Sequence, residues 1–335
     1  MKKRILTGIT PTGAPHLGNY VGAIRPAIMA SQMKDVDAFY FIADYHALIK
    51  CKNPQIIQRA SLEVAATWLA AGLDYEKVTF YRQSDLSEIL ELNWILTTCC
   101  TKGLMNRAHA YKAAVQENLE QSLTDEDHRI EMGLYCYPIL MAADILLLNA
   151  NLVPVGKDQL QHIEMTRDIA NRFNHRYQPL FSLPEALVDD QTPLLLGIDG
   201  QKMSKSYGNT IALFDPPNKL RKRVMKILTN SLEPGQAKST IDSTVYNLYS
   251  VFASEAEQET MRQAFAKGIA WGEAKQQLFE KLDNKLEPMR ERYNQLISHP
   301  MKIEEILQYG AEKARALVQP FLCEIKHAVG IKSLG

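Results

Sequence analysis

The residues that could do chemistry are concentrated first in the segment from Pro11 to Asn19. This segment follows a short apolar run, so we expect a turn and the start of a helix, where backbone N–H groups favour an anionic phosphate. His16 and Asn19 are three positions apart, share a helix face and could donate to the same phosphate. Gly18 leaves room for a flat base against the backbone. A plain helix start with a surface histidine is the alternative.

A second segment reads Lys202-Met203-Ser204-Lys205-Ser206 and lies in a glycine-rich stretch. Two lysines on a flexible loop suit a mobile clamp that neutralises the charge growing on phosphates. An exposed lysine-rich loop without such a role is the alternative. Because the five-residue string is specific and occurs together with the N-terminal segment, we expect it to act on phosphates.

A carboxylate, Asp144, interrupts the most apolar stretch of the chain, residues 139–148. Burying a lone charge is expensive, so Asp144 must be protonated or paired. Either it has a structural partner, or it forms the floor of a pocket that accepts a hydrogen bond from an aromatic ligand. Met141 lies one turn earlier, and its thioether could pack against a ring, although methionine is also ordinary core.

Two further turns are expected at the carboxyl edge of a sheet. Gly156-Lys157-Asp158-Gln159 follows a short strand and opens a helix, which is where a doubly wound sheet binds ligands. An N-cap role for Asp158 is compatible with that position. The string Asp44-Tyr45-His46 ends another strand, which makes His46 a candidate pocket residue.

The elements that position these residues predict an α/β protein. Short apolar runs alternate with amphipathic stretches, which favours a Rossmann-like, doubly wound parallel sheet covered on both faces. We predict strands at 4–7, 38–42, 78–81 and 152–155, and helices at 16–33, 56–71, 86–101, 105–119, 137–148 and 159–173.

Beyond Asp215-Pro216-Pro217 the pattern is helical. It includes residues 219–228, a helix opened by the capping box Ser254-x-x-Glu257, and a long helix near 272–297 in which Pro288 predicts a kink. We therefore predict a catalytic domain over residues 1–210 and an all-helical domain over residues 211–335.

Composition narrows the class of protein. The 38 Lys and Arg residues balance 38 Asp and Glu, so the formal net charge is zero and the protein does not coat polyanions through a cationic excess. A local basic patch remains compatible with nucleic acid, and the string from Lys219 to Arg223 is the best candidate, with a solvated helix face as the alternative. Five cysteines without a C-x-x-C pair argue against a zinc or iron–sulfur site. With no signal-peptide or membrane-spanning pattern, we expect a soluble, cytoplasmic protein.

Both signature segments resemble those of a known enzyme class. His16-Leu17-Gly18-Asn19 is similar to the His-Ile-Gly-His signature of class I aminoacyl-tRNA synthetases, and residues 202–206 match their Lys-Met-Ser-Lys-Ser signature without change. Within that class the chain most resembles the bacterial type of tryptophanyl-tRNA synthetase over nearly its whole length, through residues 18–23, 137–144 and 153–159.

The resemblance implies a role for each candidate residue. Around tryptophan it implies an indole N–H bound to Asp144, with the other contacts from Met141, His46, Gln159 and Tyr137. For ATP it implies contacts from Thr10, Pro11, Thr12, Gly18, Asn19, Gly156, Lys157, Asp158, Lys202, Met203, Ser204, Lys205 and Ser206. The implied catalytic residues are His16, Asn19, Lys112, Lys202 and Lys205, although Lys112 also suits a solvated helix face.

The chain departs from the family at several positions. Asn19 replaces the second signature histidine, and Leu6, Thr10 and Tyr45 differ from the residues of the better-known bacterial enzymes. These departures bear on the lining of the amino-acid pocket.

The implied reaction has two steps. The carboxylate of L-tryptophan attacks the α-phosphate of Mg²⁺-bound ATP, and the resulting adenylate acylates tRNA(Trp). The resemblance further implies a homodimer formed through an inserted helical region at about residues 75–150, and anticodon binding by the C-terminal helical domain. We expect no tightly bound cofactor, no protein-held metal ion, and neither membrane nor DNA as partner.

Three alternatives remain. Tyrosyl-tRNA synthetase shares the fold and uses an equivalent Asp, but usually carries Gln where this chain has Met141. A small nucleotidyltransferase with only the first signature would need no helical domain. A non-enzymatic RNA-binding module would not need either signature intact.

Overall fold

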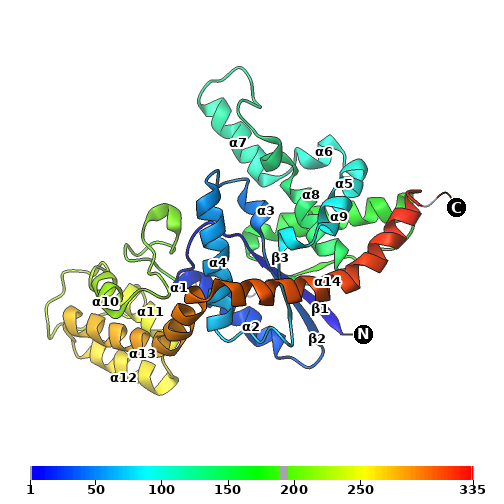
Figure 1. Cartoon of the computed structure of the whole chain (residues 1–335). Coiled ribbons are helices and arrows are strands. Elements are labelled where there is room, and N and C mark those ends of the chain that lie inside the picture. Colours follow the sequence, from blue (N-terminus) through cyan, green and yellow to red (C-terminus); the bar gives the residue numbers. More distant parts are fainter. Residues whose placement is uncertain (1, 189–194, 333, 335) are drawn as a thin grey trace.

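The computed structural model describes residues 2–188, 195–332 and 334. Figure 1 shows a central sheet surrounded by helices, with a helical bundle at one end. The strands are β1 (Lys3–Ile9), β2 (Val36–Ile42), β3 (Thr79–Arg82), β4 (Leu152–Pro154) and β5 (Glu185–Leu187). The α-helices are α1 (Leu17–Asn19), α2 (Arg25–Ser31), α3 (Asp44–Ala47), α4 (Pro54–Ala70), α5 (Glu88–Cys99), α6 (Lys102–Met105), α7 (His109–Glu120), α8 (Met132–Leu147), α9 (Leu160–Arg176), α10 (Pro217–Met225), α11 (Thr244–Phe252), α12 (Glu255–Ala266), α13 (Trp271–Ser298) and α14 (Pro300–Ala328).

The five described strands form one parallel sheet in the order β3-β2-β1-β4-β5. The chain winds outward from β1 to β2 and β3, then returns to the other side of β1 with β4 and β5. The reversal between β1 and β4 is the topological switch point at which such sheets bind ligands. The prediction of a doubly wound α/β fold is confirmed.

Alternation along β2 divides the core into two layers. Ala38, Tyr40 and Ile42 face a core shared with α2, α4 and the bundle α10 to α13. Phe39 and Phe41 face the opposite core, which is built mainly from α5, α8 and α9. Successive strand residues point to opposite faces, so both faces of the sheet are buried.

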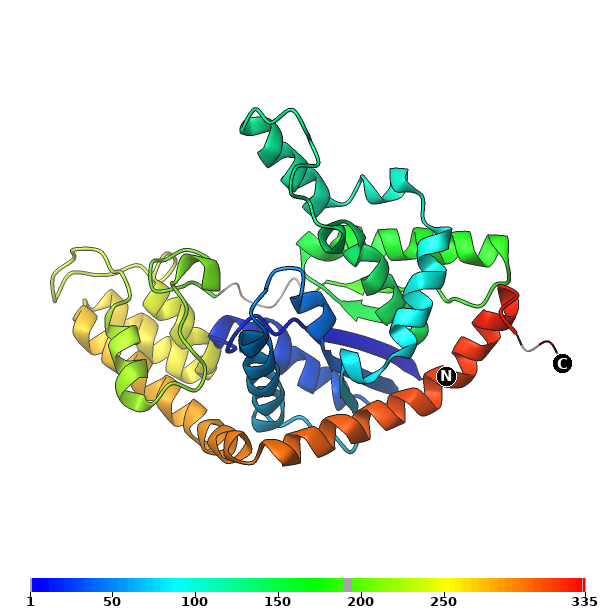
Figure 2. The same ribbon diagram turned by 45° about the horizontal axis from the view of Figure 1, so that its top comes forward.

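The last helix, α14, covers the edge of the sheet. It runs from the bundle along β3, as the long curved helix in Figure 2 shows. Its first half contributes Ile303 and Leu307 to one core, and its second half contributes Val318 and Leu322 to the other. Because an uncovered edge strand exposes unpaired backbone groups, α14 protects β3 as well as joining both cores. Residues 300–328 are thus helical, as expected beyond residue 211, but pack on the sheet of the N-terminal domain.

The local predictions hold in part. The capping box at Ser254 and Glu257 is confirmed, and Asn53 caps α4 by accepting from the N–H groups of Gln55 and Ile56. Helix α13 continues through Pro288 from Trp271 to Ser298. The helix predicted at 16–33 contains a π turn over Tyr20–Ile24, which separates α1 from α2.

Short elements escaped prediction. Strand β5 and helices α3 and α6 have only three or four residues each, too few for a periodic pattern to register. Helix α8 also begins five residues before its predicted start, at Met132. No helix of the described residues is long and apolar enough to cross a membrane.

A glycine makes the contact of α14 with β3 possible. A Cβ added at Gly310 would lie 1.7 Å from the Phe80 carbonyl oxygen, so the helix backbone touches the strand backbone there. We expect Gly310→Ala to push α14 off β3 and to destabilise the protein by about 1–3 kcal/mol, despite the better helix propensity of alanine.

The matched control is Gly272→Ala, because Gly272 is an exposed helix glycine with nothing within 4 Å of an added Cβ. It should leave the midpoint of urea unfolding unchanged or slightly higher. Equal midpoints for the two variants would show that the contact at Gly310 does not constrain the fold.

Candidate functional site

A cavity of about 510 Å³ opens at the carboxyl ends of β1 and β4, beside the switch point. Residues of both strands line it together with side chains of α3 and α8. Of the residues expected at the site, eight line this cavity: Thr10, Thr12, His46, Tyr137, Met141, Asp144, Gly156 and Gln159. The size suits a small-molecule ligand.

Asp144 is the buried acid of this cavity, with only 2% of its surface exposed. Nε2 of His46 lies 2.9 Å from its Oδ2, and Nε2 of Gln83 donates to both carboxylate oxygens at 2.8 and 3.0 Å. An ionised carboxylate only accepts hydrogen bonds, so His46 donates to it. The partners that a buried carboxylate requires are therefore present, and Asp144 still lines the cavity.

Burial raises the pKa of the Asp144 carboxyl, while the hydrogen bonds from His46 and Gln83 act in the opposite direction. The nearby Tyr81 hydroxyl is fully buried and has no hydrogen-bond partner in the described structure. Burial, and then the charge of Asp144, raise the pKa of Tyr81, so it remains a neutral phenol. Asp144 is thus a buried acid at the floor of the cavity, beside the neutral phenol of Tyr81 and hydrogen-bonded to His46 and Gln83.

Sequence reasoning missed Gln83. It follows β3 directly in the 3₁₀ turn η2 (Gln83–Asp85) and is completely buried. The signal was available, because β3 is the neighbour of β2 and its carboxyl end lies at the same edge as His46. A strand of only four residues gave little reason to look there.

Two other lining residues of the cavity, Tyr137 and Gln159, are joined by a chain of hydrogen bonds. The Tyr137 hydroxyl is bonded to Nε2 of His162, and Nδ1 of His162 lies 2.8 Å from Oε1 of Gln159. His162, on α9, is 4% exposed and was not a sequence candidate. Its ring fixes two cavity-lining groups, the Tyr137 hydroxyl and the Gln159 amide, relative to each other.

The first signature adopts a different local arrangement from the one expected. Oδ1 of Asn19 accepts the His16 backbone N–H at 3.1 Å, so this oxygen stabilises the helix start. His16 is 8% exposed, its Nδ1 has no hydrogen-bond partner in the described structure, and its ring lies within 3.0 Å of a Cβ added at Gly18. The imidazole, rather than a base, fills that space here. Burial, and then the charge of Lys205, lower the pKa of His16 to about 4, so it is neutral at pH 7.

The two signatures lie side by side. Nζ of Lys205 donates to the Gly13 carbonyl at 2.8 Å, and the backbone N–H of Leu17 donates to the carbonyl of Ile211. Met203 is buried against Gly18, whereas Lys202, Lys205 and Ser206 are exposed. The two signature segments, far apart in sequence, are therefore in contact in the fold.

Asn209, a third residue that was not a sequence candidate, shapes the lysine loop. It is 2% exposed; its Oδ1 accepts the Ser204 N–H at 2.8 Å, and its Nδ2 donates to the Lys202 carbonyl and to Asp199. A Cβ on Gly197 would lie 2.3 Å from the Asn209 side chain, so this position must be glycine. The asparagine holds the backbone on both sides of Met203.

Three further sequence candidates, Pro11, Lys157 and Lys112, lie outside the cavity lining. Pro11 is buried, and Lys157 is exposed in the 3₁₀ turn η3 (Lys157–Gln159). The same turn contains Asp158, whose side chain lies outside the part that the structure describes. Lys112 is exposed on α7, two positions after the cavity-lining Ala110.

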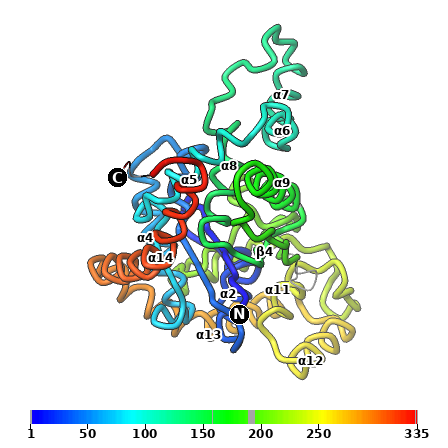
Figure 3. Tube along the Cα trace, turned by 90° about the vertical axis from the view of Figure 1, so that its right-hand side faces the viewer, coloured from blue at the N-terminus to red at the C-terminus, as the bar shows by residue number. Residues whose placement is uncertain are grey.

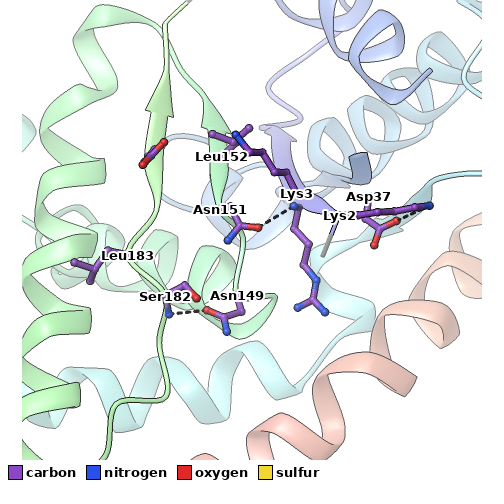
Figure 4. A pocket seen from close by; sticks show the side chains of 10 residues that line it. Lys2, Lys3, Asp37, Asn149, Asn151, Leu152, Ser182 and Leu183 are labelled. Carbon is purple, nitrogen blue, oxygen red and sulfur yellow. Dashed lines mark hydrogen bonds and ion pairs between the residues drawn. The ribbon is translucent and has the colours of Figure 1, made fainter. Parts of the chain in front are cut away.

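A second cavity, of about 520 Å³, lies at the opposite, amino-terminal edge of the sheet (Figure 4). Its polar groups are largely satisfied by one another: Asn151 accepts the backbone N–H of Arg4, Asn149 accepts that of Ser182, and Lys2 pairs with Asp37 at 3.6 Å. Parallel sheets bind ligands at the carboxyl ends of strands, so the first cavity is the candidate active site.

Within the described residues, no group of three or more His, Cys, Asp or Glu side chains could hold a metal ion. All five cysteines are free thiols.

Comparisons with known proteins indicate the same enzyme class as the two signature segments. The family described as tRNA synthetases class I (W and Y) matches residues 1–287. A tryptophan–tRNA ligase of Neisseria meningitidis is 56% identical over 333 residues, which cover 99% of both chains. One of Pseudomonas aeruginosa is 58% identical over 337 residues, which cover all of this chain and 75% of that protein.

A solved structure has a similar fold over almost the whole chain. Tryptophanyl-tRNA synthetase of Campylobacter jejuni, complexed with ADP and tryptophan, superposes with a TM-score of 0.89 at 38% identity and covers 98% of this chain and 99% of its own. The resemblance expected from the two signatures is confirmed, and the chain belongs to the class I tRNA synthetases of the tryptophan and tyrosine group, within the tryptophan–tRNA ligase family.

Proposed function

We propose that this chain attaches L-tryptophan to tRNA(Trp) through a tryptophanyl-adenylate, with release of pyrophosphate and then AMP. The observation that carries the proposal is the cavity at the switch point, which has a buried acceptor, Asp144, at its floor and both signature segments beside it. The 54–58% identical relatives named as tryptophan–tRNA ligases support the same assignment.

In this proposal the indole N–H of tryptophan donates to Asp144. The ring packs between apolar groups that line the cavity, among them Leu6, Phe41 and Met141. We assign the polar end of the amino acid to the Tyr137 hydroxyl and the Gln159 amide, which also line the cavity and are held together through His162. His46 acts through Asp144, to which it is hydrogen-bonded.

Tyrosine is the competing substrate, because a phenol O–H could also donate to Asp144. The aliphatic thioether of Met141 offers a flat ring dispersion contacts and no hydrogen bond. An amide at that position would instead suit a second polar contact with a hydroxyl. The side chain at position 141 therefore favours indole.

ATP would bind across the two signatures as its Mg²⁺ complex, so the metal ion enters with the substrate. The ATP contacts assigned to the first signature segment are those of Thr10, Pro11, Thr12, Gly18 and Asn19. We assign residues 156–158 to the ribose of ATP and residues 202–206 to its phosphates. The location of Thr10, Thr12 and Gly156 in the cavity wall and the contact of Lys205 with Gly13 support this arrangement.

The chemical step needs no covalent enzyme intermediate. A tryptophan carboxylate oxygen forms a bond to the α-phosphorus of ATP as the bond to pyrophosphate breaks, and the 3′-terminal ribose of the tRNA then displaces AMP. The protein contributes positioning and stabilisation of the charge that grows on the phosphates. We assign this charge stabilisation to Lys202, Lys205 and Lys112, and uncharged contacts to His16, which is neutral, and Asn19.

The tRNA would contact the helical part of the chain. Lys219, Arg221 and Lys222 are exposed on α10, directly after the signature loop, while Leu220 anchors the helix in the core. These three exposed cations form a local basic patch on a chain whose net charge is zero. Anticodon binding by residues 211–335 is part of the same proposal.

A homodimer through residues 75–150 completes the proposal. This region contains exposed apolar side chains, with Leu90 40%, Trp94 69% and Met132 67% exposed. Helices α6 and α7 extend away from the body of the molecule (Figure 3), where a second copy could contact them. We also retain the expectation of a cytoplasmic protein.

The substrate assignment is tested by pyrophosphate exchange. The purified protein should exchange pyrophosphate into ATP in the presence of tryptophan and not of tyrosine. Asp144→Ala should raise KM for tryptophan by about 10- to 100-fold, the effect of losing a hydrogen bond to a charged group, with KM for ATP little changed. Exchange with tyrosine alone would overturn the assignment of tryptophan as the substrate. Equal effects of Asp144→Ala on KM for tryptophan and KM for ATP would mean that Asp144 has a structural role.

The lysine loop is tested by single-turnover kinetics. Lys205→Ala should slow adenylate formation by about 100-fold, because a preformed charge contact to the phosphates is lost. The dissociation constant of tryptophan should not change. Lys34→Ala, at an exposed lysine shortly after α2, serves as the control. An unchanged rate of adenylate formation in Lys205→Ala would remove the loop from the chemistry.

The tRNA surface is tested by replacing Lys219, Arg221 and Lys222 with Gln. The variant should charge tRNA several-fold less efficiently at low salt, and the difference from the wild type should narrow at higher salt, because the lost phosphate contacts also make binding less salt-dependent. Tryptophan activation should be unaffected. A Lys2→Gln, Lys3→Gln variant, changed at the amino-terminal edge of the sheet, is the control. Loss of activation instead would mean that α10 supports the lysine loop.

A further inference from the structure

Gln83 makes hydrogen bonds with both ends of its amide while completely buried. Its Nε2 donates to the two oxygens of Asp144 at 2.8 and 3.0 Å, and its Oε1 accepts the backbone N–H of Tyr45 at 3.1 Å. Reversing the amide would turn its oxygen toward the carboxylate and its NH₂ toward the N–H of Tyr45. The Gln83 amide therefore has one orientation that satisfies its partners at both ends.

The turn that contains Gln83 is tied to α3 on one side. Oδ1 of Asp44 accepts the N–H of Ser84 at 3.0 Å and that of Tyr45 at 3.1 Å. The two segments that supply the donors of Asp144, with His46 on one and Gln83 on the other, thus share a single carboxylate anchor. A shift of one would carry the other with it.

On the other side the turn is tied to α14. Arg82 forms two hydrogen bonds with Glu304, at 3.1 and 2.9 Å, and two with Asp85, at 3.2 and 2.7 Å. Arg315 contacts the Asp85 carbonyl oxygen and lies 3.3 Å from Glu88. The residues immediately before and shortly after Gln83 are therefore held by two side chains of α14.

These ion pairs are only partly shielded from solvent. The side chains of Arg82, Asp85 and Glu304 are 26%, 10% and 39% exposed. A two-pronged contact between a guanidinium and a carboxylate fixes direction as well as distance. Gly310 lets α14 lie directly on Phe80. The helix therefore cannot slide along β3 without breaking the contact between Arg82 and Glu304.

We propose that Gln83 is a positioning residue that keeps Asp144 aimed at the indole N–H, and that α14 holds Gln83 in place through Arg82 and Arg315. The C-terminal helix then helps to determine which amino acid the distant cavity accepts. This inference rests on the proposed contact of Asp144 with the indole.

The test compares tryptophan with benzothienylalanine, in which sulfur replaces the indole N–H. Wild-type protein should use tryptophan more efficiently, because only tryptophan donates to Asp144. Gln83→Met keeps the length of the side chain but removes the donor. It should lower kcat/KM for tryptophan in pyrophosphate exchange by about 10- to 100-fold and that for benzothienylalanine by much less.

The outcomes separate the two proposals. A wild-type protein that does not discriminate between the two amino acids would overturn the contact of Asp144 with the indole. Discrimination by the wild type together with equal losses for both substrates in Gln83→Met would overturn the role of Gln83. KM for ATP serves as the internal control and should remain unchanged.

The role of α14 is tested at its surface, where folding is not at risk. Glu304→Gln should raise KM for tryptophan by a few-fold without changing kcat or KM for ATP, and reduce discrimination against benzothienylalanine. The control is Glu305→Gln, at the exposed neighbouring position. If Glu304→Gln behaves like Glu305→Gln in both measurements, α14 does not hold Gln83, and this part of the proposal is wrong.

Discussion

The burial of one carboxylate is the constraint on which the site depends. Asp144 lies on an apolar helix with 2% of its surface exposed. An unpaired charge there would destabilise the folded state by more than a single good packing contact stabilises it. The fold meets this constraint with donors from two other segments, His46 after β2 and Gln83 after β3. A parallel sheet brings both to one edge, because its strands end side by side.

The same constraint explains why the edge of the sheet needs α14. Strand β3 is short and pairs with a neighbour on one side only, yet Gln83 must be held within hydrogen-bonding distance of Asp144. Helix α14 covers the open side, joins the cores on both faces and pairs with Arg82. The C-terminal part of the chain is thus structurally continuous with the site, although it begins as a separate helical bundle.

Sequence reasoning succeeded where a pattern was long or chemically specific. The two signatures, the apolar helix around Asp144 and the alternation of strands with long helices all led to the observed arrangement. It failed for β5, α3 and α6, whose three or four residues carry no periodicity, and for the contact of α14 with the sheet, which no local pattern encodes. Gln83 and Asn209 were missed because a single buried amide resembles any polar loop residue until its partners are known.

The contact between Asp144 and the indole is measured most directly by an NMR spectrum of tryptophan labelled with ¹⁵N in the indole and bound to the protein. If Asp144 accepts the indole N–H, that proton should be shifted downfield and protected from exchange with water, and both effects should be lost in Asp144→Ala when that variant is saturated with tryptophan. An indole N–H that exchanges as freely in the complex as in solution would contradict this contact.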